Sequence, residues 1–178
     1  KTVQKGRASP TDTTVSTYGG IVLITGGSRR RLPPQNMHLV VGDSLVSHST
    51  SRMVEQVADL KKRHPEIVDP VLDAIHGVSM SAIHHLSNPR ELGRYMNMNN
   101  SLLEALGVGH PQLARMILAS RSAGAFGAKI TGAGGGGSMV ALCPKQLKHR
   151  VAKAIESCDG RAIVTSIDTE GASKEKNV

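Results

Sequence analysis

Two kinds of apolar spacing alternate along the chain. Short continuous runs at 21–24, 38–43, 128–130, 139–142 and 162–167 predict strands, because runs of this length fit a buried strand. Between the second and third runs, apolar residues recur every three or four positions, which predicts helices over 49–64, 67–83, 88–107 and 111–124. Pro144 opens one more helix before the last run. From residue 34 onward, this order predicts an α+β fold of ferredoxin-like type, with four strands and helices on one face.

The first 33 residues follow a different pattern. Ser9-Pro10-Thr11-Asp12 predicts a helix start, with Ser9 as N-cap and Asp12 in the first turn, and Gly19-Gly20 ends that helix. One apolar strand follows, and then 26–31 is expected to form a turn. Pro33-Pro34 is typical of a linker. We therefore expect 1–33 to be the end of a preceding domain, 34–170 to be the main domain and 171–178 to be a polar tail.

Five glycines occupy six positions between two predicted strands, from Gly132 to Gly137. Glycine loses more conformational freedom on folding than any other residue, so such a run indicates backbone at φ > 0 or close to a ligand. Its N–H groups can converge on an anion, and phosphate is the first candidate. The run does not fit the Walker A spacing. A tight glycine hairpin without a ligand is the alternative.

Composition narrows the function classes. The 178 residues include no Trp, one Phe and two Tyr, which argues against stacking on single-stranded nucleic acid. The net charge of +8 suits an anionic substrate such as a nucleotide. Two cysteines without metal or disulfide spacing indicate a reducing compartment, here the cytoplasm. No apolar run is long enough to span a membrane and no signal peptide is evident, so no membrane partner is expected. The chain begins at Lys1 and is expected to be a fragment.

Three segments together resemble the mevalonate kinases of the GHMP kinase superfamily, in particular those of archaeal type. Gly6 to Gly20 is similar to the segment that carries the family's catalytic aspartate, and Met96-Asn97-Met98-Asn99-Asn100 is similar to a following helix. Lys129 to Ser138 matches the third motif of the superfamily. The resemblance covers about Gly6 to Ile167 and implies a C-terminal half: a GHMP kinase C-terminal domain preceded by a remnant of the ribosomal protein S5-like N-terminal domain.

The resemblance implies an ATP-dependent kinase that phosphorylates mevalonate, with Mg²⁺, and a homodimer in the complete enzyme. It implies that Asp12 is catalytic and that Thr17 and Thr50 bind the substrate. The implied ATP-phosphate loop consists of Gly132, Ala133, Gly134, Gly135, Gly136, Gly137 and Ser138. No metal ligand is expected in this chain, because the family's ligands lie in the half that is absent here.

Each of these residues also has a plainer interpretation. Asp12 can stabilise its own helix start, Thr17 can bond back to a main-chain carbonyl, and Thr50 can cap a helix. The chain departs from the family at Ser138, at Asn100 and at Ser44-Leu45, where the family often has Thr-Gly. Another GHMP small-molecule kinase and a non-catalytic ferredoxin-like binding module are the alternative functions.

Overall fold

The structure is a computed structural model, and it describes residues 11–172. Within these residues the chain divides into two compact units, one formed by 37–165 and the other by 11–36 together with 166–172. The start of the first helix at Ser9-Pro10 lies outside the described residues, as do the last six positions of the expected tail. The domain boundaries expected from the sequence stay predictions.

The larger unit contains a four-stranded sheet in the order β4-β5-β3-β6. Its strands are β3 (His38–Asp43), β4 (Gly127–Ile130), β5 (Ser138–Cys143) and β6 (Arg161–Ser166). The central strand β5 pairs antiparallel with β3, with Val40 opposite Ala141, and with β4, with Ile130 opposite Met139. A strand, helices, two strands, a helix and a strand therefore follow one another in a ferredoxin-like arrangement, which confirms the predicted α+β class.

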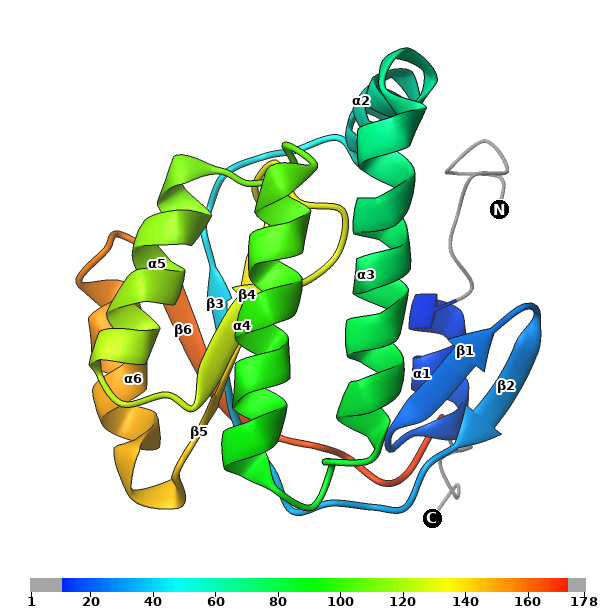
Figure 1. The fold of residues 1–178 in the computed structure, drawn as a ribbon. Coiled ribbons are helices and arrows are strands. Elements are labelled where there is room, and N and C mark those ends of the chain that lie inside the picture. The colour runs from blue at the N-terminus through cyan, green and yellow to red at the C-terminus, as the bar shows by residue number, and fades with distance from the viewer. Residues whose placement is uncertain (1–10, 173–178) are drawn as a thin grey trace. The chain divides into compact units, whose positions relative to one another are not determined.

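Six helical segments complete this unit. They are α2 (Thr50–Arg63), α3 (Pro65–Ile83), α4 (Pro89–Ala105), α5 (Pro111–Ser122), the 3-10 turn η1 (Lys145–Leu147) and α6 (Lys148–Glu156). Figure 1 shows how the α-helices of this unit are arranged. Only α5 and α6 cover the sheet face as expected. Helix α4 lies along the edge strand β4, α3 packs on α4, and α2 packs on α3. None of the helices within 11–172 is long and apolar enough to cross a membrane.

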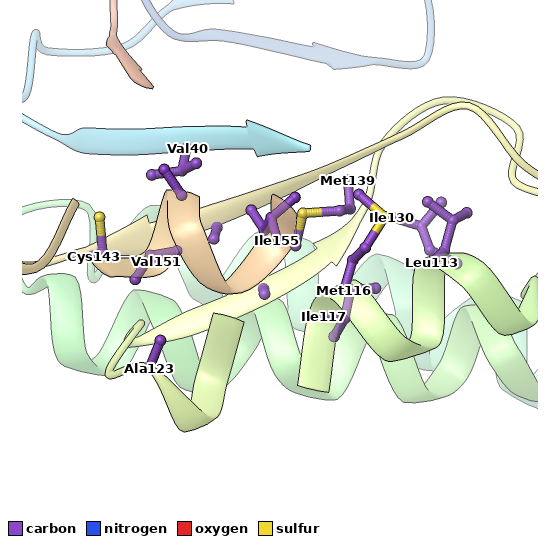
Figure 2. Close-up of a cluster of buried hydrophobic side chains, with 13 residues drawn as sticks. Val40, Leu113, Met116, Ile117, Ala123, Ile130, Met139, Cys143, Val151 and Ile155 are labelled. Atoms are coloured by element: carbon purple, nitrogen blue, oxygen red, sulfur yellow. The ribbon is translucent and has the colours of Figure 1, made fainter. Parts of the chain in front are cut away.

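The hydrophobic core lies between the sheet and helices α5 and α6 (Figure 2). Side chains from alternate strand positions meet side chains from the two helices; the main contributors are Val40, Ile130, Met139, Leu113, Met116, Val151 and Ile155. Gly42 leaves room for the two methionines, because a Cβ there would lie 2.7 Å from Met116 Cε and 2.9 Å from Met139 Sδ. The core thus fixes the two strands that lead into and out of the glycine loop.

The smaller unit contains helix α1 (Thr11–Tyr18) and a hairpin of β1 (Val22–Thr25) and β2 (Ser28–Arg31). The expectation that 26–31 forms only a turn is wrong, because Ser28–Arg31 is a strand. Gly26 and Gly27 both have positive φ and make the two-residue turn, so the strand they start pairs with β1 although all four of its residues are exposed. Within this unit, Ala172 N donates to Ser16 O and Gly20 N donates to Asp168 O.

Candidate phosphate-binding site

The glycine loop, residues 131–137, connects β4 to β5. All five of its glycines have positive φ, from +73° at Gly137 to +143° at Gly136. A side chain is strained in this region of backbone space, so the composition of the loop follows from its path. Thr131 N donates to Ser138 O at 3.0 Å and closes the loop at its base. The loop therefore has a defined conformation, which distinguishes it from a flexible linker.

Two neighbouring segments hold the loop in place. Gly135 N donates to Val108 O at 2.9 Å, and Gly137 N donates to Val46 O at 3.1 Å. Gly134 packs so closely that a Cβ there would lie 2.1 Å from Val108 O. The amides of Gly134 and Gly136 make no hydrogen bond within residues 11–172, and both residues are buried. The Gly135 amide, in contrast, is already used to hold the loop.

A pocket of about 410 Å³ lies between the loop and the start of α2; it is lined by Ser47, His48, Ser49, Arg52, Met53, Gln56 and Gly135. Ser49 is the N-cap of α2, and its Oγ accepts from Arg52 N at 3.4 Å. Thr50 is the first residue of the helix and is exposed. His48 closes the other side, since a Cβ on Gly137 would lie 2.5 Å from His48 Cε1.

The electrostatics of this pocket favour an anion. The N-terminus of a helix carries a partial positive charge, and the first turn of α2 contains no acidic residue to neutralise it. Arg52 adds a full charge in the same turn, and its guanidinium forms no ion pair in the described part of the chain. The pocket thus combines a helix N-terminus with an arginine beside the glycine loop, and both features bind phosphate groups in proteins.

Sequence reasoning missed Arg52, His48 and Val108. A signal for Arg52 was present, because an arginine in the first turn of a helix opposes the helix dipole unless an anion accompanies it. Nothing local marks Val108, which lies 27 positions before Gly135 and contributes only a carbonyl oxygen. Lys129, just before the loop, donates from Nζ to Ile130 O at 2.8 Å, and burial lowers the pKa of its ammonium group.

Asp12 and Thr17 both lie on α1, in the smaller unit. Asp12 is exposed in the first turn of that helix. Thr17 Oγ1 donates to Thr13 O at 2.7 Å, so its hydroxyl proton is used within the helix, while its oxygen can still accept. The structure thus brings the glycine loop together with the start of α2 next to Thr50, and it places Asp12 and Thr17 together on a different unit.

Metal binding has a separate answer. Among residues 11–172, no group of three or more His, Cys, Asp or Glu side chains is arranged to hold a metal ion.

Comparison with known proteins gives consistent results. Residues 79–160 match the family model for the C-terminal domain of GHMP kinases. The mevalonate kinase of Thermococcus sibiricus is 41% identical over 174 residues, covering 94% of this chain and 52% of that protein. The mevalonate kinase of Methanothermobacter thermautotrophicus is 41% identical over 147 residues, covering 79% of this chain and 47% of that protein. The chain thus spans about half the length of the relatives it matches.

A solved structure agrees with these sequence matches. The L. major mevalonate kinase in complex with R-mevalonate superposes with a TM-score of 0.86 at 26% identity. The match covers 94% of this chain and 55% of that one. The similarity therefore extends over nearly all of the chain.

Proposed function

Because this chain belongs to the GHMP kinase family and carries its C-terminal domain, we propose that the complete protein is a mevalonate kinase, which transfers the γ-phosphoryl group of ATP to the 5-hydroxyl of mevalonate. The observation that carries the proposal is the 41% identity to an archaeal mevalonate kinase over 94% of the chain. The anion pocket beside the glycine loop agrees with it, since a kinase must hold the phosphates of ATP.

The glycine loop and the start of α2 serve phosphate binding in this proposal. Phosphoryl transfer needs little covalent chemistry from the protein; it needs positioning and positive charge close to the transferred group. The Gly134 and Gly136 amides donate to phosphate oxygens, and Arg52 together with the α2 N-terminus stabilises the negative charge. Thr50, at the start of the same helix, contacts the substrate.

Residues of the smaller unit act on the attacking hydroxyl of mevalonate. Asp12 accepts the proton of the mevalonate hydroxyl or orients that hydroxyl, and its exposed carboxylate is free to do either. Thr17 lies five residues further along α1, and its Oγ1 accepts a hydrogen bond from the substrate while donating to Thr13 O.

We further propose that ATP acts together with Mg²⁺, which neutralises phosphate charge. A homodimer and a cytoplasmic location complete the proposal. Both cysteines, Cys143 and Cys158, are free thiols, which suits a reducing compartment.

A substrate panel on the complete protein tests the function. We expect ADP release with mevalonate, and little with phosphomevalonate or homoserine. A preference for one of the other two alcohols would assign a different GHMP kinase activity, and no ATP turnover with any of them would favour a binding module.

The role of Asp12 has its own test. Asp12→Asn in the complete protein should lower kcat about 10²- to 10⁴-fold while leaving KM for ATP nearly unchanged, because the variant loses general-base help at the hydroxyl. Full activity of this variant would remove Asp12 from the mechanism.

A further inference from the structure

The edge of the sheet at β4 is closed by side chains of a helix. An edge strand exposes alternate N–H and C=O groups that have no strand partner. Here Ala128 N donates to Asn97 Oδ1 and Ile130 N donates to Asn100 Oδ1, both at 3.0 Å. The Ala128 carbonyl accepts from Arg121 Nη2 of α5 at 2.7 Å. Two asparagines one turn apart on α4 thus take the place that a fifth strand would occupy.

Asn100 is the more constrained of the two asparagines. Its side chain is 1% exposed, and its Nδ2 donates to Glu104 Oε1 at 2.9 Å. Both ends of the amide are therefore satisfied, with the oxygen directed to the strand and the nitrogen to the helix. A buried amide with both partners in place has one strongly preferred orientation, because any other leaves polar groups unpaired.

The same helix also holds the middle of the glycine loop. The chain leaves α4 through Gly107, at φ +76°, and the next residue, Val108, offers the carbonyl that accepts from Gly135 N. Ile130, which Asn100 holds, directly precedes the loop. One helix therefore fixes the loop at its entrance through Asn100 and at its centre through Val108.

We propose that Asn100, assisted by Asn97, is a positioning residue for the glycine loop. By holding β4 against α4, it sets where the free amides of Gly134 and Gly136 stand relative to the start of α2. This inference rests on the proposed function, in which those amides bind the phosphates of ATP. Asn100 itself does not contact the nucleotide.

The first test replaces Asn100 by Ala in the complete protein. Loss of one hydrogen bond, worth about 0.5–1.5 kcal/mol, should raise KM for ATP by roughly 2- to 12-fold with a smaller change in kcat and in KM for mevalonate. Asn99→Ala is the matched control, since Asn99 lies on the same helix and its side chain forms no hydrogen bond in the described structure. A lower Tm with an unchanged KM for ATP would make Asn100 purely structural and overturn the inference.

A second test reverses the direction of the hydrogen bond between residues 100 and 104. Asn100→Asp alone places a carboxylate beside that of Glu104 and should raise KM for ATP further, because like charges repel at this distance. Adding Glu104→Gln introduces a donor at position 104, so that the hydrogen bond to position 100 forms in the opposite direction, and it leaves the net charge as in the wild type. We expect the double variant to recover most of the wild-type KM. Failure to recover, with a wild-type Tm, would contradict the proposed contact.

A third measurement separates this inference from the proposed function. Amide hydrogen exchange on the 178-residue chain should show faster exchange at Ile130 and Gly135 in Asn100→Ala than in the wild type, while exchange at Val40 in strand β3 is unaffected. If the complete protein proves inactive on mevalonate, the exchange result still decides whether Asn100 positions the loop. Unchanged exchange at Gly135 would overturn the inference whatever the activity.

Discussion

At the scale of single residues, the most unusual conformation is that of Leu45, which has φ +58° and a side chain that is 65% exposed. Asp43 Oδ1 accepts from Leu45 N at 3.0 Å, and Arg161 pairs with the same carboxylate at 3.1 Å. Next to it, Ser44 N donates to Gly137 O at the end of the glycine loop. The strained backbone of Leu45 therefore lies close to the pocket, in a segment that hydrogen bonds and an ion pair hold in place.

Leu45→Gly should stabilise the chain. Relief of a left-handed conformation is worth about 1–2 kcal/mol, and the added freedom of glycine in the unfolded chain offsets about 0.5–1 of it. A net gain of about 0.5–1 kcal/mol corresponds to roughly 1–4 °C in Tm for a chain of this size. Asp159→Gly is the control: Asp159 has φ +60°, but Asp tolerates this region better, so its gain should be smaller. A lower Tm for Leu45→Gly would show that the leucine side chain itself stabilises the fold.

Gly135 offers a second prediction at this scale, for the complete protein. A Cβ at Gly135 would lie 2.5 Å from Met53 Sδ and would enter the pocket at φ +74°. Gly27→Ala serves as control, because Gly27 has φ +83° and nothing within 4 Å of its Cβ. Both variants should lose about 1–2 kcal/mol of stability through strain, while only Gly135→Ala should also raise KM for ATP. If thermal melts show that the two variants are equally stable and their KM values for ATP are also equal, the loop has only a structural role.

At the scale of elements, helix α4 and the start of β4 approach each other very closely. A Cβ on Gly93 would lie 2.4 Å from the main-chain carbon of Phe126, and one on Gly127 would lie 2.1 Å from Gly93 O. Such an approach is possible only between glycines. It brings α4 near enough for Asn97 and Asn100 to reach the strand amides.

Two glycine-to-alanine variants in helices should therefore have opposite effects. Gly93→Ala should destabilise the chain by about 1–3 kcal/mol through overpacking against backbone, in spite of the better helix propensity of alanine. Gly77→Ala, in the interior of α3 with nothing within 4 Å, should stabilise it by up to about 1 kcal/mol. Urea unfolding of both variants gives the comparison, and a neutral Gly93→Ala would show that the two elements can separate without loss.

At the scale of the whole molecule, the chain matches about half the length of its mevalonate kinase relatives. It contains the pocket beside the glycine loop and Asp12, and in the proposed function the remainder of the complete protein supplies the ligands of the Mg²⁺ ion. A phosphoryl-transfer site without a cation on the phosphates lacks its main electrostatic stabilisation.

We therefore expect the 178-residue chain alone to show no mevalonate-dependent ADP release, in contrast to the complete protein. A coupled assay with ATP, Mg²⁺ and mevalonate makes the comparison, with circular dichroism as the control for folding. Turnover near the usual enzymatic range of about 1–10³ s⁻¹ would contradict this expectation. It would mean that the chain holds a complete phosphate and metal site of its own.

The sequence by itself determined the features that depend on neighbouring residues. Helix α4 begins after Asn88, with Pro89 as its first residue, because the side-chain oxygen of an N-cap residue accepts from an amide three residues away. Asn88 Oδ1 does accept from Glu91 N, at 3.3 Å. The five glycines of the loop likewise all take positive φ. The predicted order of strands and helices in the larger unit followed from apolar spacing, which reports burial on one face of an element.

Only the tertiary structure decided which of these elements contact one another. Strand β2 carries no apolar signal and exists because a two-glycine turn folds it onto β1. Arg52 lines the pocket together with Gly135, which lies 83 residues later in the chain. The Val108 carbonyl accepts from the Gly135 amide, and the Asn100 side chain accepts from Ile130 N on the edge strand β4. Such contacts join segments far apart in the chain. Their geometry depends on how all the elements pack at once, which a local pattern of residues does not contain.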